Sequence, residues 1–217
     1  MSRNINFLHQ ELASAAATHQ ARIRSRLENI RPDTCSVNVE DAVLSRQVSG
    51  VIIHVCDTGT PAGLGVHWRL FLQLDQGQDR RRPPVSIELN CQALDQQQIT
   101  RMFVTQHSYM MSSTPASAAQ PVGLPQHQLY WAIPNRTDFT VAAAVQHLLD
   151  LRRDCYRLTE RGIGCRFWCL TVIHDLEVRG WFPPGTANNA AGFVTAFSTL
   201  TQASYVVPAA IAQGTFY

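Results

Sequence analysis

Two short segments, far apart in the sequence, hold the residue types of a thiol nucleophile and its base. His67 opens an alternating segment, HWRLFLQL, that predicts a β-strand. Cys165 lies in the segment GCRFW, at the predicted beginning of a helix. A helix N-terminus and a nearby imidazole both lower the pKa of a thiol, and the thiolate is the reactive form of cysteine. The pair therefore predicts nucleophilic catalysis, with Cys165 attacking a carbonyl and His67 acting as the base.

The surroundings of both residues suit this chemistry. Gly162 and Gly164 allow a strained, open approach to the thiol. The backbone N–H groups of Cys165 and Arg166, at the helix start, are placed to hold an oxyanion. In a hairpin of 66–74 with 85–90, counting back from the loop puts His67 opposite roughly Asn90. Strand parity puts Glu88 and Asn90 on the face of His67, so either side chain is a candidate to orient the imidazole.

Packing is the alternative role for each of these residues taken alone. Cys165 shares a helical stripe with Cys169 and Val172, and free cysteine is among the most buried residue types. His67 alone fits an ordinary strand-end histidine. Four further side chains are predicted as substrate contacts, although core packing is the commoner role of the aromatic ones: Arg69, Arg166, Trp68 and Trp168.

Composition narrows the class of function. The chain has 217 residues, of which 45% are hydrophobic and 16% charged, as in globular proteins, and a net charge of +2 gives no argument for nucleic acid. All 18 basic residues are arginine, which excludes Schiff-base chemistry on lysine and a P-loop lysine. The six cysteines form no CxxC pair and the histidines are scattered, so we expect neither a metal nor another cofactor.

The expected location is the cytoplasm, with reduced thiols. The first 30 residues lack the apolar run and cleavage site of a secretory signal, and no stretch approaches the ~20 apolar residues of a transmembrane helix. We therefore expect a small-molecule substrate as partner, without nucleic acid or a stable membrane anchor. A second copy of the chain, forming a homodimer, stays a candidate partner.

The pattern along the chain predicts an α+β domain in which an antiparallel sheet packs against the helix that carries Cys165. A helix at 7–27 and a linker form a first segment, 1–47, and the domain itself spans 48–217. Asp138 is predicted as the N-cap of a helix to about 153, and 112–128 as a long loop. The remaining predicted elements are strands at 48–56, 66–74, 85–90, 101–111 and 129–133, and helices at 165–179 and 187–200.

The segment from Cys155 to Trp168, CYRLTERGIGCRFW, resembles the region around the catalytic cysteine of the lecithin retinol acyltransferase-like proteins. There, Tyr-x-Leu-Thr precedes an Asn-Cys-Glu-His-Phe segment that opens a helix. The His67-Trp68 strand is similar to that family's His-Trp strand, which carries the general base. The resemblance covers roughly 48–180 and departs from the family at Gly164, Arg166 and Phe167, which stand where the family has asparagine, glutamate and histidine.

That family belongs with the NlpC/P60 group, so the resemblance implies a circularly permuted papain-like fold and a covalent thio-acyl enzyme. The family's third polar residue would fall on Glu88 or Asn90. The chain also resembles small fungal proteins, some associated with secondary-metabolite genes, which implies a small-molecule substrate.

Three functions follow in order of preference. The first is cysteine-dependent acyl transfer or hydrolysis of a small ester, thioester or amide. The second is non-covalent cyclisation or isomerisation of a polyketide- or terpenoid-like substrate, with His67, Glu88 and Arg69 as acid–base or hydrogen-bonding groups. The third is a binding or scaffold protein without chemistry.

Overall fold

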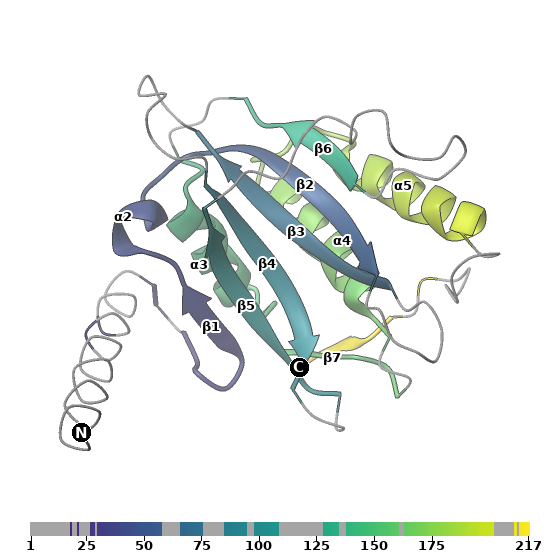
Figure 1. Ribbon diagram of the computed structural model, residues 1–217, viewed down its shortest axis with the longest axis horizontal. Coiled ribbons are helices and arrows are strands. Elements are labelled where there is room, and N and C mark those ends of the chain that lie inside the picture. The colour runs from purple at the N-terminus through teal and green to yellow at the C-terminus, as the bar shows by residue number, and fades with distance from the viewer. Residues whose placement is uncertain are drawn as a thin grey trace, which may run out of the picture.

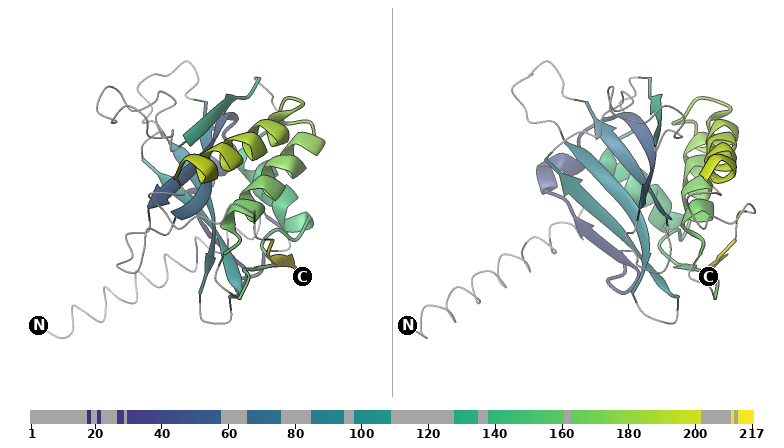
Figure 2. Two further views of the ribbon diagram at one scale, coloured as in Figure 1. Left: turned by 90° about the vertical axis from the view of Figure 1, so that its right-hand side faces the viewer. Right: turned by 45° about the vertical axis from the view of Figure 1, so that its right-hand side comes forward.

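A six-stranded mixed sheet forms one layer of the protein, and three helices, α3 (Val141–Asp150), α4 (Cys165–Val178) and α5 (Thr186–Thr201), form the other (Figures 1 and 2). The computed structural model describes residues 18, 21, 27–28, 30–57, 66–75, 85–94, 98–108, 128–134, 138–160, 163–201, 211 and 213–217. The helix expected at 7–27 and the loop expected at 112–128 lie almost entirely outside these residues. The α+β class predicted from the sequence is confirmed.

The strands of the sheet follow the order β1-β5-β4-β3-β2-β6, and only β1 and β5 run parallel. The sheet is therefore mixed, and the expectation of a purely antiparallel sheet is corrected. The difference comes from β1, a four-residue strand inside the segment expected to be a linker. The strands are β1 (Cys35–Asn38), β2 (Val48–Asp57), β3 (Val66–Leu74), β4 (Ser86–Ala93), β5 (Thr100–His107) and β6 (Gln128–Ala132).

Smaller elements complete the fold. A single-turn helix, α2 (Asp41–Leu44), joins β1 to β2, and a two-stranded sheet pairs β7 (Tyr156–Arg157) with β8 (Thr215–Phe216). No helix among the described residues is long and apolar enough to cross a bilayer.

The two faces of β3 have different surroundings, as its alternating sequence predicts. Trp68, Leu70 and their alternating partners point into the core beneath the helices, where they are buried. Phe71 is buried on the opposite face, where its ring meets those of His54 and His107. Strand alternation places His67 and Arg69 on this second face, which we call the open face.

The sheet divides between β3 and β4 at the end that carries His67. The two strands pair only from Leu70 opposite Leu89 to Gln73 opposite Ser86. Before Leu70, β3 pairs with β2 alone, and after Leu89, β4 pairs with β5 alone. Helix α4 contacts both strands, and Figure 1 shows it behind the place where they diverge. Because the two strands diverge here, the first residue of α4, Cys165, can reach the side chains of the open face.

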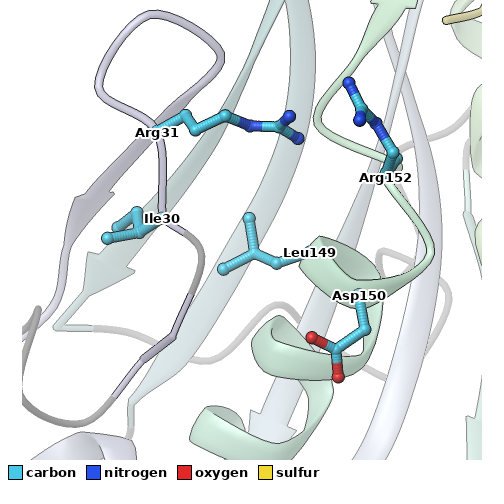
Figure 3. A pocket seen from close by; sticks show the side chains of 5 residues that line it. All are labelled: Ile30, Arg31, Leu149, Asp150 and Arg152. Carbon is cyan, nitrogen blue, oxygen red and sulfur yellow. The ribbon is translucent and has the colours of Figure 1, made fainter.

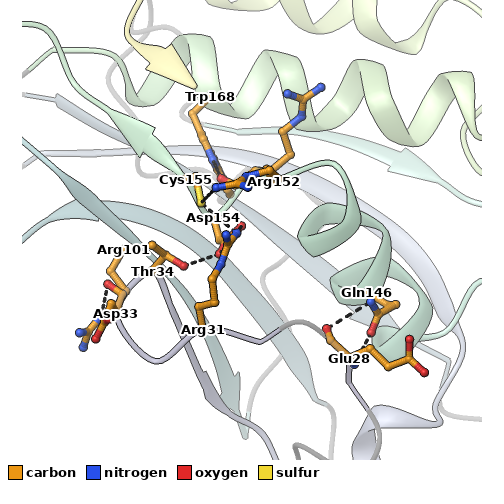
Figure 4. Close-up of polar contacts among 11 residues, drawn as sticks. Glu28, Arg31, Asp33, Thr34, Arg101, Gln146, Arg152, Asp154, Cys155 and Trp168 are labelled. Carbon is orange, nitrogen blue, oxygen red and sulfur yellow. Dashed lines mark hydrogen bonds and ion pairs between the residues drawn. The ribbon is translucent and has the colours of Figure 1, made fainter. Parts of the chain in front are cut away.

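A cluster of polar contacts fastens the turn before β1 to the connection between α3 and β7 (Figure 4). Arg31 Nη2 donates to both carboxylate oxygens of Asp154 at 3.1 Å and lies 2.9 Å from the Cys155 sulfur. The hydroxyl of Thr34 also donates to Asp154, whose side chain is fully buried. The segment expected as a linker is thus tied to the main domain by an ion pair whose carboxylate is buried.

Thr140, and not the expected Asp138, caps α3. The Thr140 hydroxyl accepts a hydrogen bond from the Ala143 N–H at 3.2 Å. The Asp138 carboxylate instead accepts from the indole N–H of Trp181 at 3.0 Å. Sequence spacing allows either residue to cap the helix, and the position of Trp181 decides between them.

We expect Thr140→Ala to lower the free energy of unfolding by about 1 kcal/mol, because an N–H at the start of α3 loses its partner. Urea unfolding followed by circular dichroism measures the change. Thr195→Ala, in the exposed middle of α5, is the matched control, since its hydroxyl donates to the Ala191 carbonyl, which the helix already uses, and caps no helix terminus. Equal losses from the two variants would contradict the capping role.

Candidate active site

Cys165 is the first residue of α4, and a tightly packed glycine precedes it. Gly164 has φ +151°, a conformation that side chains rarely adopt, and a Cβ there would lie 2.8 Å from the hydroxyl oxygen of Tyr156. The Tyr156 hydroxyl donates to the Gly164 carbonyl at 3.0 Å and accepts from the Gly214 N–H at 2.9 Å. The buried Tyr156 therefore fixes the chain immediately before the thiol.

The Cys165 thiol and the His67 imidazole are hydrogen-bonded to each other. Burial by itself raises the pKa of the thiol, but the bond to His67, the charge of its ring and two backbone N–H groups outweigh burial and lower that pKa. For His67, burial works against the imidazolium, yet the bond to Cys165, its charge and Asn90 raise the pKa. Both shifts favour a thiolate–imidazolium pair.

The two backbone N–H groups come from different elements. One belongs to Arg166, in the first turn of α4, where unpaired N–H groups are expected. The other belongs to Trp68, in the part of β3 that pairs with β2 alone. The divergence of β3 from β4 thus leaves a strand N–H available to the sulfur.

The other cysteines of the core show what burial does without a partner imidazole. Burial raises the pKa of the Cys35 thiol to about 12, and it also raises the pKa values of the Cys91 and Cys169 thiols well above the ordinary range. Cys169 lies one turn after Cys165 on the same helix. The lowered pKa of Cys165 is therefore a property of its contacts with β3 and the start of α4.

A line of hydrogen bonds continues from His67 into β4. His67 Nε2 lies 2.6 Å from Asn90 Oδ1, and Asn90 Nδ2 donates to Glu88 Oε1 at 2.9 Å. Because Glu88 accepts from the amide nitrogen, the amide oxygen must face the imidazole, so Nε2 donates and carries the proton. That leaves Nδ1 for the thiol. Asn90 is the direct neighbour of His67, and Glu88 orients Asn90.

The Glu88 carboxylate is held from three sides. Besides Asn90, it accepts from Arg69 Nη1 at 3.1 Å and from His107 Nε2 at 2.8 Å. Its side chain is only 9% exposed. A buried carboxylate with three donors is rigid, so the orientation that it gives to the Asn90 amide is fixed.

The structure brings together Cys165, His67, Asn90, Glu88 and Arg69. The other three side chains predicted to contact a substrate are buried elsewhere. Trp68 and Trp168 are buried, so they offer no exposed surface to a ligand in this conformation. The Trp168 indole donates to the Arg153 carbonyl. The Arg166 guanidinium is also buried and donates to Ser198 on α5 at 2.6 Å, which joins the two helices.

Two contributors were not predicted from the sequence. His107 is the last residue of β5, and only the observed register of β5 with β4 shows that its side chain lies on the same face as Glu88. Tyr156 belongs to the segment that resembles the acyltransferase-like proteins, but a two-residue strand gives no periodic signal.

A separate pocket lies beside the cluster around Asp154 and is lined by Ile30, Arg31, Leu149, Asp150 and Arg152 (Figure 3). Arg152 adopts a positive φ of 56° at the end of α3. The pocket contains none of the residues of the Cys165 site. Within the described part of the chain, no group of three or more His, Cys, Asp or Glu residues is arranged to hold a metal ion.

Comparison with known proteins places the chain in a family without naming an activity. Neither curated proteins nor solved structures give a match. A family model described as "Domain of unknown function (DUF7770)" matches residues 51–217, which include every residue of the candidate site from His67 to Cys165. The chain therefore belongs to the DUF7770 family.

Proposed function

We propose that this protein is a cysteine-dependent enzyme that transfers or hydrolyses the acyl group of a small ester, thioester or amide. The supporting observation is the hydrogen-bonded line from Cys165 through His67 to Asn90, with the pKa of the thiol lowered and that of the imidazole raised. A nucleophile, a base and a residue that orients the base are the three parts that acyl transfer by cysteine requires.

In the proposed reaction the Cys165 sulfur attacks the substrate carbonyl and forms a carbon–sulfur bond. We propose that the oxyanion accepts from the backbone N–H groups of Cys165 and Arg166 at the start of α4, and that the Trp68 N–H, which contacts the sulfur, assists them. His67, as imidazolium, gives its proton to the leaving alcohol, thiol or amine when that bond breaks. It then takes a proton from water or another acceptor, which attacks the thioester and releases Cys165.

We also propose that the fold is a circularly permuted papain-like arrangement of the NlpC/P60 type. The features that support it are a histidine on a strand that precedes, in the sequence, a cysteine at a helix N-terminus. A further supporting feature is the asparagine on the neighbouring strand that accepts from the histidine. The resemblance of the Tyr156 to Trp168 segment to the acyltransferase-like proteins agrees with this proposal.

Non-covalent cyclisation is less well supported. It would use Glu88 as an acid–base or hydrogen-bonding group for the substrate, and Glu88 already accepts hydrogen bonds from Asn90, Arg69 and His107. No specific observation favours a scaffold role over chemistry at Cys165.

The test is the rate of alkylation by iodoacetamide between pH 5 and pH 9, with the modified residue identified by mass spectrometry. We expect Cys165 to react first. Its rate should rise with a midpoint below the ~8.5 of an ordinary thiol, because the thiolate persists down to a lower pH when the folded pKa is lowered. At still lower pH the thiolate is protonated, and the rate should fall.

Cys56→Ser is the matched control, because Cys56 is the other cysteine that is partly exposed. This variant should keep the fast reaction, whereas Cys165→Ala should lose it. Incubation with p-nitrophenyl esters should add an acyl group to the parent protein and not to Cys165→Ala. If Cys165 resists alkylation, or titrates like an ordinary thiol, the proposal is wrong.

A further inference from the structure

We propose that Arg69 binds a carboxylate of the substrate, so that the enzyme acts on acyl compounds that carry a carboxylate group near the reacting carbonyl. This inference rests on the proposed function, since it assigns a substrate class to the Cys165 site. It is carried by the position of Arg69 and by the donors that its guanidinium leaves unused.

Arg69 follows His67 by two residues on β3, and the two side chains share the open face of the sheet. Two residues along a strand span about 6.6 Å, so a substrate can contact both side chains at once. The Arg69 side chain is 27% exposed, which makes the guanidinium accessible from this face. Its position therefore suits a group that lies a few bonds away from the carbonyl attacked by Cys165.

Only part of the guanidinium is engaged. Nη1 donates to Glu88, and the group lies 5.2 Å from the centroid of the Phe71 ring, which limits its rotation. Within the described residues, Nε is buried and has no hydrogen-bond partner. Nη2 also has no hydrogen-bond partner within the described residues, and the side chain is partly exposed. A charge-assisted hydrogen bond from Nη2 to a carboxylate oxygen is the contact that we infer.

The charges around Arg69 favour an anion. Glu88 is the one carboxylate on the open face within the described strands, and His107 and Asn90 share it with Arg69. The neighbouring ionisable side chains from β2, β3 and β5 are imidazoles: His54, His67 and His107. An incoming carboxylate thus meets two anions that are each paired with a cation, Glu88 with Arg69 and the Cys165 thiolate with the His67 imidazolium, and no unpaired carboxylate among the described strands.

The test compares haloalkanoates with their amides as alkylating agents for Cys165. In each reaction the sulfur displaces the halide from carbon, and the carboxylate or amide remains unchanged. The pairs are iodoacetate with iodoacetamide, 3-bromopropionate with 3-bromopropionamide, and 4-bromobutyrate with 4-bromobutyramide. For the length that fits best, we expect Arg69→Gln to lower the carboxylate-to-amide rate ratio at least about tenfold, since the positive charge and a charge-assisted hydrogen bond are lost.

Arg179→Gln removes the same charge at the opposite end of α4 and should leave the ratio of the parent protein unchanged. Arg69→Lys keeps the positive charge but replaces the planar guanidinium by an ammonium group, so we expect an intermediate ratio. This variant serves as the test if Arg69→Gln does not fold. Equal ratios in the parent, Arg69→Gln and Arg179→Gln at all three lengths would overturn the inference alone. If the amides also fail to modify Cys165, the proposed function itself fails.

Discussion

Replacing His67 by glutamine should lower the rate at which iodoacetamide modifies Cys165 at pH 7 by about ten- to a hundredfold. Without the imidazole, burial dominates, and the pKa of the thiol should move from its lowered value to one above that of an ordinary thiol. The thiolate is then a small fraction at neutral pH. A thiolate whose thiol has a higher pKa is intrinsically more nucleophilic, and this offsets part of the loss in alkylation rate. The expected range of ten- to a hundredfold is wide for this reason.

The pH profile gives a sharper readout than the rate at one pH. In the parent protein the reaction should begin at a pH below the ordinary thiol range, and in His67→Gln it should begin only in alkaline solution. His174→Gln is the control, because His174 is exposed on the same helix, more than two turns after Cys165. A midpoint that does not move in His67→Gln would mean that the imidazole does not set the pKa of the thiol.

Gly164→Ala should lower the free energy of unfolding by about 2–4 kcal/mol, a large loss for the addition of a single methyl group. Two causes add at this position. The φ of +151° is strained for any side chain, and the new Cβ would lie 2.8 Å from the Tyr156 hydroxyl and 3.1 Å from Leu158 Cδ2. Urea unfolding measures the loss.

Two other glycines separate these causes. Gly180 has φ +81° with open space around its Cβ position, so Gly180→Ala should show the backbone cost alone, about 1 kcal/mol. Gly192 lies inside α5 with open space, and Gly192→Ala should stabilise by up to about 1 kcal/mol. A loss in Gly164→Ala no greater than that in Gly180→Ala would show that the contact with Tyr156 yields easily.

Strand alternation was the pattern from which the bounds of β3 and the face of Glu88 and Asn90 were predicted. The bounds of β3 were predicted correctly, because an apolar residue occupies every second position from Val66 to Leu74 and only Phe71 departs from the polar set between them. The register with β4 was two residues away from the one observed, where Leu70 faces Leu89. An error of two residues preserves strand parity, so Glu88 and Asn90 were still assigned to the face of His67.

The remaining features depend on contacts that no local pattern contains. Glu88 and Asn90 have the same parity, and only the divergence of β3 from β4 determines which of them meets His67. Arg166 was expected near the substrate because it follows Cys165, yet its direction along the first turn of α4 takes it to Ser198. The elements β1, β7 and β8 are too short for a periodic signal, and they form because their partners are already in place.

The split between β3 and β4 also has a consequence for the newly made chain. His67 emerges from the ribosome long before Cys165, and the thiol meets its base only after α4 has docked behind two strands that have already diverged. Until that long-range contact forms, Cys165 has the weak acidity of an ordinary thiol. In the proposed mechanism, Cys165 therefore gains its raised acidity, and with it its reactivity, only when folding is complete.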